Sequence, residues 1–381
     1  MRRLPIPHER DFTSGLRSPE VAARVGLWLG ICFTVAFVTG VWSHLYQNQP
    51  SWLTIPPRPV WLYRVTQGLH YLSGTAAVPL LLVKLYSVYP KLFADVPWRR
   101  MRDLVLHLLE RGSILLLVSA AIFQLATGVA NSAQFYPWSF SFRATHYAVA
   151  WVAFGSLVLH VAVKLPVIRS ALTRPVDDGE PPGQGLTRRG LVCTALGASG
   201  LAVLAVAGGT VPWLRSVSIF ETHDGSGPQD IPINKSAHRA GVTASATDPA
   251  FTLEVVHGDA TERLSLADLD ALPQQTEELP IACVEGWSRS GSWSGVRLRD
   301  LLDLVGAPAG VDVRVTSLQE RGPFRWSDVR GNLADDTMTL VALRLNGERL
   351  AIDHGYPCRL IAPNRPGVLQ TKWLGRVEVL A

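Results

Sequence analysis

The sequence predicts a multi-domain protein: an all-α membrane bundle of four helices, then one further transmembrane helix, then an α+β domain. Three observations support this prediction. The chain of 381 residues has room for two or three domains, and 48% hydrophobic residues is a high share for a purely soluble protein. Five long apolar segments occupy the first half of the chain. Polar and turn residues interrupt shorter apolar runs in the second half.

The five apolar segments are each long enough to cross a hydrocarbon layer of about 30 Å as a helix that rises about 1.5 Å per residue. We expect them at 25–45, 63–89, 104–130, 142–168 and 191–214. The first four define a membrane domain, 25–170, and a Pro/Gly-rich linker, 171–190, separates it from the fifth helix, 191–214. The remaining residues, 215–381, form the third domain.

Positive charges predict the orientation of these helices. Residues 1–24 lack the pattern of a secretory signal peptide and carry five arginines, and the segments 90–103 and 164–189 are also basic. The alternate loops, 46–62 and 131–143, hold only Arg58 and Arg143. By the positive-inside rule, the amino terminus is cytoplasmic and residues 215–381 are extracytoplasmic. The outer ends carry aromatic residues suited to membrane interfaces, namely Trp52, Trp61, Tyr136 and Trp138.

The charge distribution argues against nucleic acid as a partner and favours membrane lipid. Residues 1–213 carry 19 Lys/Arg against 9 Asp/Glu, whereas residues 214–381 carry 17 against 22. Binding to phosphate backbones requires basic clusters on a folded surface, and here the basic excess lies beside apolar segments.

The segment before the fifth helix reads Thr187-Arg188-Arg189-Gly190-Leu191. Directly before an Ala/Gly-rich helix, it resembles a twin-arginine translocation signal placed inside the chain. The alternative is that the two arginines mark the cytoplasmic end of that helix.

Five histidines lie within or at the edge of the first four apolar segments: His44, His70, His107, His146 and His160. Ionisable residues are costly inside a bilayer and usually functional, so haem ligation is favoured over the alternative of hydrogen-bonded core histidines. His146 and His160 are fourteen residues apart. Fourteen helical steps return to within roughly 40° of the start and advance about 21 Å, so both rings face nearly the same way, at different depths.

Depth in the membrane suggests the partners of these two histidines. His70 matches His146 in the outer half, and His107 matches His160 in the inner half, which predicts two low-spin b-type haems. His44 is a further candidate, either as a competitor of His70 or as a hydrogen-bond partner of a haem propionate. The basic residues Arg64, Lys84 and Arg111 either meet propionates or extend toward the membrane surface.

Residues 25–170 resemble the di-haem b-type cytochrome subunits of bacterial membrane oxidoreductases such as formate dehydrogenase and hydrogenase. Those subunits have a four-helix core with two histidines at this spacing on the fourth helix. The resemblance implies quinone or quinol as a partner and a bacterial cell membrane as the location. One position departs from the pattern, because the first segment offers Arg24 where those subunits place the inner ligand.

The third domain is expected to be α+β. Short apolar runs predict strands at 251–257, 311–318, 338–345, 359–362 and 375–380. Amphipathic patterns predict helices at 266–272 and 298–305.

Cys283 lies in the segment IACVEGWSRSGSWSGVRLRDLL, which predicts a turn rich in Gly, Ser and Trp. A cysteine there can bind a metal, attack a substrate, form a disulfide with Cys358 or serve as a small buried apolar residue. Cys32 and Cys193 lie in apolar segments. The sequence has no CxxC motif and no Cys/His cluster at zinc spacing, which disfavours iron–sulfur, c-type haem and structural zinc sites.

Residues 230–381 resemble the molybdenum-cofactor domain of the sulfite oxidase family. The motifs are CVEGWS, GSWSGVRLRDLL and LNGERLAIDHGYPCRLIAPNRPGVLQTKWLGRVEVL. The resemblance implies that Cys283 binds molybdenum through its sulfur, beside the dithiolene of a molybdopterin. It also implies pterin contacts from the cationic and polar residues Arg359, Arg365, Lys372, Asn234 and Lys235.

The other candidates each keep two interpretations. Four residues face the substrate or belong to the surface: His238, Arg239, Arg289 and Arg325. Trp287 and Trp293 either form walls of the site or pack in the core, and Cys358 is expected to be a plain buried residue.

CVEGW is most similar to the catalytic subunit of periplasmic methionine sulfoxide reductases. This implies a membrane-bound molybdoenzyme that passes electrons from quinol through two b haems to an extracytoplasmic centre, where a small or protein-bound oxidised substrate, such as an S-oxide, is reduced. One alternative is sulfite-type oxidation with electrons flowing to quinone. Another is a non-catalytic haem protein whose outer domain only binds a partner.

Overall fold

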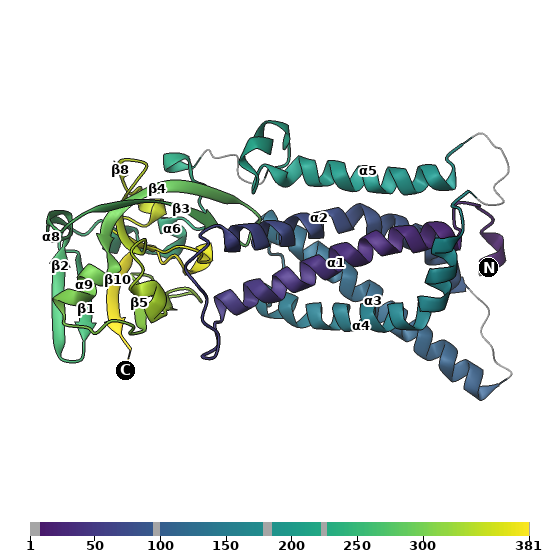
Figure 1. Ribbon diagram of the computed structural model, residues 1–381, viewed down its shortest axis with the longest axis horizontal. Helices are drawn as coiled ribbons and strands as arrows, with labels where there is room; N and C mark the ends of the chain where they lie inside the picture. Colours follow the sequence, from purple (N-terminus) through teal and green to yellow (C-terminus); the bar gives the residue numbers. More distant parts are fainter. Residues whose placement is uncertain (1–7, 94–99, 178–184, 222–226, 381) are drawn as a thin grey trace, which may run out of the picture. The chain divides into compact units, whose positions relative to one another are not determined.

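The computed structural model describes residues 8–93, 100–177, 185–221 and 227–380 (Figure 1). Parts of the basic segments 1–24, 90–103 and 164–189, whose charges predict the orientation, lie outside these residues. The chain forms two compact units. The first comprises residues 1–41, 69–207 and 217–220, and the second comprises residues 42–68, 208–216 and 221–381.

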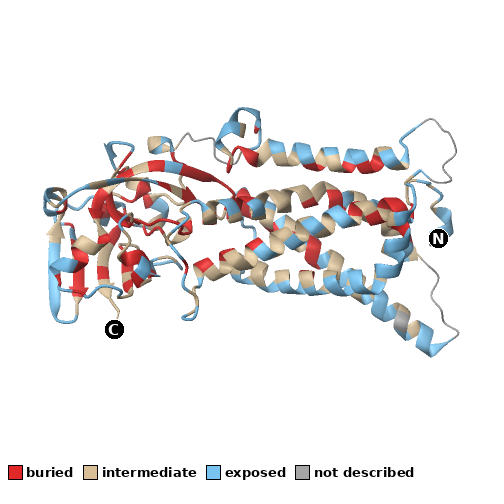
Figure 2. Cartoon of the chain, viewed as in Figure 1, coloured by how far each residue is buried: buried red, intermediate tan, exposed pale blue. Residues whose placement is uncertain are grey.

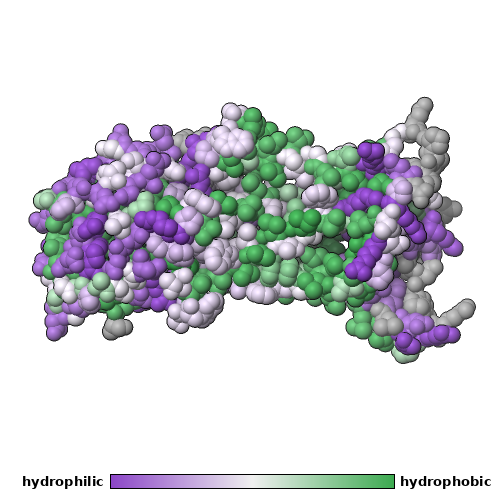
Figure 3. Space-filling view, viewed as in Figure 1, coloured by the Kyte–Doolittle hydropathy of each residue, from purple (hydrophilic) through white to green (hydrophobic). Residues whose placement is uncertain are grey.

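Among the described residues, five helices are long and apolar enough to cross a membrane: α1 (Pro19–Gln47), α2 (Leu62–Val88), α3 (Met101–Ser132), α4 (Phe142–Thr173) and α5 (Arg188–Ala207). They confirm the predicted apolar helices, and we conclude that this is a membrane protein. Apolar side chains on these helices are exposed, as Figure 3 shows on the visible face. Leu82, for example, is 63% exposed.

The fifth helix is shorter than predicted. It ends at Ala207 instead of residue 214, and a separate 3-10 helix, Pro212–Val217, follows. Gly208 and Gly209 favour a break there, and the proline ring of Pro212 cannot continue an α-helix.

Within the first unit, small and branched side chains bring the helices together. One buried cluster joins α1, α2 and α5 through Val21, Val25, Leu80, Leu191 and Ala195. Arg24 donates to the carbonyl oxygens of Ala171 and Arg174, near the end of α4. Arg24 therefore anchors the end of a neighbouring helix.

The second unit contains two five-stranded sheets. The first has the order β2-β1-β10-β5-β6, with β1 and β10 parallel and the other pairs antiparallel. Its strands are β1 (Thr252–His257), β2 (Ala260–Ser265), β5 (Val313–Ser317), β6 (Trp326–Val329) and β10 (Leu374–Val379).

The second sheet has the order β3-β4-β7-β8, and β9 also pairs with β7. Its strands are β3 (Gln275–Ala282), β4 (Ser288–Arg297), β7 (Leu340–Leu345), β8 (Glu348–Arg349) and β9 (Arg359–Ile361). The helices of this unit are short: α6 (Ala237–Ala240), α7 (Thr243–Ala246), α8 (Leu266–Ala271), α9 (Leu298–Leu304) and α10 (Gly331–Ala334).

The core of the second unit lies between its sheets and helices, where buried residues concentrate in Figure 2. Leu253, Leu301, Val315 and Val377 are fully buried there. Burial of such side chains contributes about 1.5–3 kcal/mol each. The five predicted strands and both predicted helices are confirmed, with boundaries shifted by one or two residues.

The sequence predicts a turn rich in Gly, Ser and Trp around Cys283, and the structure shows a shorter turn followed by a strand. The turn covers only the residues between β3 and β4, and SRSGSWSGVR forms β4, the strand that joins β3 to β7. A Cβ at Gly291 would lie 2.7 Å from Leu345 Cδ1, and a Cβ at Gly295 would overlap the Val341 carbonyl. The glycines that suggested a turn therefore allow β7 to approach closely.

Candidate functional site

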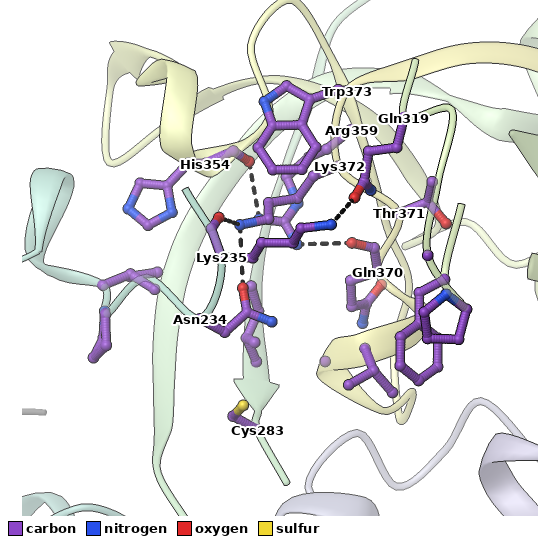
Figure 4. Close-up of a pocket in the computed structure, with 18 of the residues that line it drawn as sticks. Asn234, Lys235, Cys283, Gln319, His354, Arg359, Gln370, Thr371, Lys372 and Trp373 are labelled. Atoms are coloured by element: carbon purple, nitrogen blue, oxygen red, sulfur yellow. Dashed lines mark hydrogen bonds between the residues drawn. The ribbon is translucent and has the colours of Figure 1, made fainter. Parts of the chain in front are cut away.

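A pocket of about 170 Å³ lies in the second unit (Figure 4). Five parts of the chain contribute to it: the segment 231–235, the end of β3 with Cys283, the loop 319–324, the turn around His354 with Arg359 of β9, and the segment 367–373. All of these belong to the same compact unit.

Cys283 follows directly after β3 and is 2% exposed. Its backbone N–H donates to the Trp287 carbonyl at 2.8 Å, and the Gly286 N–H donates back to the Cys283 carbonyl at 3.2 Å. Gly286 has φ 96°, which glycine adopts without strain. This tight turn fixes the position of the Cys283 sulfur at the pocket wall.

Burial raises the pKa of the Cys283 thiol well above its usual range, and the neighbouring Glu285 adds to the effect. The thiol becomes a thiolate only when a cation replaces its proton. Among the described residues, no group of three or more His, Cys, Asp or Glu side chains is placed to hold a metal ion. A metal at Cys283 would therefore take its other ligands from a chelating molecule. Cys283 and Cys358 are both free, so the disulfide alternative is not realised.

Lys372 precedes β10 and extends among neutral oxygen atoms. Its ammonium donates to Asn234 Oδ1 at 3.1 Å and to the carbonyl oxygens of Lys235 and Asp353 at 2.7 and 2.9 Å. Burial, together with the nearby Arg359 charge, lowers the pKa of Lys372 to about 7. The protein provides the ammonium with hydrogen bonds to neutral groups, and the nearby Asp353 carboxylate offsets part of this lowering of the Lys372 pKa.

Arg359 of β9 is 3% exposed. Its guanidinium donates to the carbonyl oxygens of His354 and Gln370, both at 3.0 Å, and lies 5.0 Å from the ring centroid of Trp293. Burial lowers the pKa of Arg359 to about 9. Its Nε is buried and has no hydrogen-bond partner among the residues that the structure describes. The guanidinium is thus held rigidly, with part of its donor capacity unused.

Lys235 completes a cluster of three cations with Arg359 and Lys372, and its ammonium donates to Gln319 Oε1. In Figure 4 the three cations gather on one side of the pocket, and Cys283 lies apart from them. Of the described residues that line the pocket, none is Asp or Glu. Buried positive charges without carboxylates are costly, so the arrangement favours an anionic ligand such as a phosphate.

Of the predicted pterin contacts, the structure brings Asn234, Lys235, Arg359 and Lys372 together around the pocket. It places Arg365 elsewhere. The Arg365 guanidinium is buried and donates to the Leu369 carbonyl, Ser327 Oγ and the Asp328 carbonyl. Arg365 therefore braces the loop that contributes to the pocket, but it does not line the pocket itself.

None of the predicted substrate-facing residues lines the pocket. Arg289 is buried in an ion pair with Glu221 and also donates to the Gly209 carbonyl. Arg325 is exposed and donates to the Glu320 carbonyl, and the remaining two, His238 and Arg239, are exposed on α6. The interpretation of these four residues as surface or structural groups therefore fits better.

The two tryptophans differ. Trp287 lines the pocket, whereas Trp293 is fully buried and its indole N–H donates to the Leu279 carbonyl at 3.1 Å. Cys358 is fully buried, with its sulfur 3.4 Å from the Leu374 carbonyl oxygen, and burial raises the pKa of its thiol. It fits the expected plain buried residue.

The sequence analysis missed several lining residues: Gln319, Phe324, His354, Gln370, Thr371 and Trp373. Most are neutral and carry no sequence signal. His354 was the exception that a search for titratable residues near Arg359 would have found. Its Nε2 lies 2.6 Å from the Pro228 carbonyl oxygen, and burial lowers the pKa of His354 to about 4, so the ring is neutral at neutral pH.

In the first unit, His70 of α2 and His146 of α4 lie close together, with ring centroids 6.4 Å apart. His70 Nδ1 lies 2.8 Å from the Ala36 carbonyl oxygen, and His146 Nδ1 lies 3.0 Å from Thr127 Oγ1. Such contacts orient metal-binding imidazoles and direct Nε2 toward the metal. Two rings that each bind a shared metal at about 2 Å have centroids roughly 6 Å apart. The pair therefore has suitable spacing for one metal.

The other predicted histidines have different surroundings. Within the described part of the chain, His107 and His160 make no ring contact with each other, and His107 Nε2 is buried without a hydrogen-bond partner. His44 Nδ1 lies 3.4 Å from the Asn48 side-chain nitrogen. Lys84 donates to the Ala22 carbonyl at 2.7 Å.

Arg64 and Arg111 also contact backbone carbonyls. Arg111 donates to the carbonyl oxygens of Lys91 and Leu92, and Arg64 donates to Thr210 O and to Ser290 Oγ.

Comparison with known proteins finds a family match in the second unit. Residues 240–381 match the family model described as oxidoreductase molybdopterin binding domain. Several curated proteins are also similar to the chain, and three of them illustrate the range. The first, from Azospira oryzae, is named "Putative protein-methionine-sulfoxide reductase subunit YedZ1" and is 31% identical over 110 residues, 29% of this chain and 41% of that protein.

The second is the uncharacterized oxidoreductase YuiH of Bacillus subtilis, 32% identical over 120 residues, 30% of this chain and 57% of that protein. The third is a sulfite oxidase of Arabidopsis thaliana, 31% identical over 114 residues, 25% of this chain and 29% of that protein. Each alignment covers less than two thirds of the relative's length. The sulfane dehydrogenase SoxCD of Paracoccus pantotrophus aligns at 22% identity and a TM-score of 0.32 over 35% of this chain and 40% of that one, too weak a likeness to carry an argument.

Proposed function

We propose that this chain, whose residues 240–381 are a molybdopterin-binding oxidoreductase domain, passes electrons between the quinone pool and an extracytoplasmic substrate through two b haems. We further propose that it reduces an S-oxide or a similar oxidised substrate. The observation that carries the proposal is the pocket in which three cations accompany a buried cysteine without any lining carboxylate.

The residues of the pocket fit a molybdopterin. Lys235, Arg359 and Lys372 would hold its phosphate, with Asn234 as a neutral partner, and the Cys283 thiolate would bind the molybdenum. When bound, the cofactor supplies oxygen-atom exchange and two-electron redox chemistry. The chain itself contributes one soft ligand in a rigid turn and a fixed set of donors, so that the bound group needs no reorganisation of the protein.

The remaining lining of the pocket favours a neutral substrate. Residues with no charge dominate it, among them Trp287, Phe324 and Val368. An anion such as sulfite would need a cation of its own, and the arginine nearest to Cys283 in sequence, Arg289, is committed to Glu221. A neutral S-oxide instead needs apolar walls and one or two hydrogen-bond donors. This supports S-oxide reduction over sulfite-type oxidation.

The membrane helices would supply the electrons. We assign His70 and His146 to the outer haem because of their spacing and their Nδ1 contacts. His107 and His160 are assigned to the inner haem on their depth alone. The amino terminus is placed in the cytoplasm and the catalytic domain outside, as the loop charges predict. Quinol would then be oxidised near the membrane.

Replacement of Cys283 by serine tests this function in purified full-length protein. We expect the molybdenum content and S-oxide-dependent reoxidation of reduced haem to fall at least a hundredfold, because serine lacks the soft sulfur ligand. Cys193→Ser, on the surface of α5, is the matched control and should leave both unchanged.

Unchanged metal content in Cys283→Ser would contradict the assignment. A panel that compares neutral S-oxides, sulfite and N-oxides decides the substrate class. Reduction of haem by sulfite, with no reoxidation by S-oxides, would reverse the proposed direction.

A further inference from the structure

Residues 42–68, which comprise the end of α1, the loop 48–61 and the start of α2, belong to the same compact unit as the pocket. We call them the connecting hairpin. Its side chains Tyr46, Ile55 and Tyr63 are almost fully buried and form one cluster with Ala282, the residue before Cys283. The hairpin is therefore part of the packed unit that contains the pocket.

The buried side chain of Asn364 joins the hairpin to the pocket loop, residues 363–371. Asn364 is 4% exposed, and its amide makes three hydrogen bonds, all to the hairpin. Its Oδ1 accepts from the Tyr63 N–H at 2.9 Å, and its Nδ2 donates to the Pro56 carbonyl at 2.8 Å and to the Tyr46 hydroxyl at 3.1 Å. The Tyr63 N–H lies in the first turn of α2, where backbone donors have no partner within the helix. Asn364 thus caps this helix from a distant part of the chain.

The loop that carries Asn364 also forms a wall of the pocket. Gly367, Val368, Gln370 and Thr371 line the pocket. A Cβ at Gly367 would lie 2.8 Å from the Ala282 carbonyl oxygen, so the loop packs against the end of β3 directly before Cys283. The hairpin, the loop and the base of the cysteine turn therefore meet at one residue, Ala282.

The conformation at Asn364 is also specific. It has φ 48°, in the left-handed region that asparagine and glycine tolerate better than other residues. At the far end of the loop, Gln370 bonds both the N–H and the carbonyl of Ala362, each at 2.8 Å. The Gln370 side chain therefore ties the end of the loop back to Ala362, and the hairpin holds the start of the loop at Asn364.

We propose that Asn364 is a positioning residue through which the connecting hairpin holds the pocket loop in place, so that the cofactor pocket depends on the end of α1, the start of α2 and the loop between them. The inference deepens the proposed function, because it assigns these parts of the chain to the catalytic unit.

Hydrogen–deuterium exchange on the purified, cofactor-free full chain tests the proposal without any turnover. In Asn364→Gly, which keeps the left-handed backbone and removes all three hydrogen bonds, we expect exchange in peptides covering 48–62 and 363–372 to rise roughly tenfold or more. Tyr46→Phe removes one bond from the hairpin side and should give a smaller rise in the same two regions. This milder variant keeps the test valid if the glycine variant folds poorly.

Asn332→Ala is the matched control. Its side chain donates to the Ile55 carbonyl at 2.8 Å from α10, so it holds the same hairpin but contributes nothing to the pocket lining. We expect faster exchange only in 48–62. Unchanged exchange of 363–372 in Asn364→Gly would overturn the proposal, and so would an equal rise in that loop in Asn332→Ala. Because the readout needs no substrate, failure of the S-oxide activity would leave the proposal intact.

Discussion

The two candidate cofactor sites are built on different physical principles. In the helical unit, His70 and His146 stand among apolar side chains, and each ring is oriented by one neighbouring oxygen atom. In the second unit, the pocket concentrates three cations around neutral carbonyls and amides, next to a thiol in a rigid turn. A helix-borne site needs only correctly spaced ligands, whereas the pocket needs a network of segments that lie far apart in sequence.

The two units also differ in how far their apolar residues are exposed. Apolar residues on the helices are largely exposed, and those of the second unit are buried (Figures 2 and 3). In an apolar helix, any histidine is conspicuous and costly. In the second unit, charged residues are common on the surface, so charge alone does not identify the site.

The largest expected effect concerns the helical site. His146→Ala should remove the outer haem entirely, so that the haem-to-protein ratio falls from about two to about one, because a bis-imidazole haem cannot keep its low-spin state with one ligand. The pyridine haemochrome assay and the reduced-minus-oxidised spectrum measure this. His44→Ala is the control, since His44 Nδ1 lies 3.4 Å from the Asn48 side-chain nitrogen, whereas the ring close to His146 is that of His70.

Two results would contradict the assignment of His70 and His146 as ligands of one haem. If His146→Ala retains both haems, the pair does not ligate, and the two rings are merely packed. If His44→Ala loses one haem, His44 takes the place that we assign to His70.

The next effect concerns the cationic pocket. Lys372→Met keeps the length of the side chain and removes its charge, so we expect the molybdenum-cofactor content after purification to fall roughly a hundredfold, from the loss of charge-assisted hydrogen bonds to the phosphate. Metal analysis measures it. The cofactor-free variant should unfold at the same temperature or a higher one, because the wild-type protein bears the cost of a partly buried ammonium.

Arg325→Met serves as the control, because Arg325 is exposed and lies outside the pocket lining. Equal cofactor loss in both variants would indicate a general effect of lost positive charge and would contradict the specific role of Lys372.

Sequence patterns predicted the helical half more completely than the pocket. The five apolar segments, and the depth match of His70 with His146, follow from local composition and helical geometry, and the structure brings those two rings together. The pairing of His107 with His160 stays a prediction, because depth alone does not fix which faces of two helices meet.

In the second unit, the motifs pointed to Cys283, Arg359 and Lys372, which line the pocket, and to Arg365, which does not. Arg365 and Lys372 look equally suitable in sequence. The fold separates them, because Arg365 is turned toward Ser327 and Asp328 under its own loop. Neutral residues such as Gln370 and Thr371 gave no signal, because their role arises only from long-range packing.

The smallest expected effect is a pH dependence that Lys372 imposes on anion binding. The pKa of Lys372 is lowered to about 7, whereas the pKa of the neighbouring Arg359 is about 9 and that of His354 about 4. Between pH 6 and 8, Lys372 loses its proton, Arg359 stays charged and His354 stays neutral. Sulfate keeps a constant charge over this range, so its affinity for the cofactor-free protein should fall as pH rises, by up to about tenfold.

The direction in which stability changes with pH follows from the linkage between proton binding and folding. Because the folded pKa of Lys372 lies below its ordinary value of 10.5, the unfolded chain holds more protons between about pH 7 and 10.5, and this group makes the anion-free protein more stable as pH rises through that window. Bound sulfate favours the protonated form of Lys372 and therefore opposes this rise of stability with pH. Thermal unfolding with and without sulfate at pH 6, 7 and 8 measures both effects. Lys372→Met should abolish the pH dependence. If the pH dependence persists in that variant, another group titrates, and the proposed role of Lys372 in the pH dependence of anion binding is wrong.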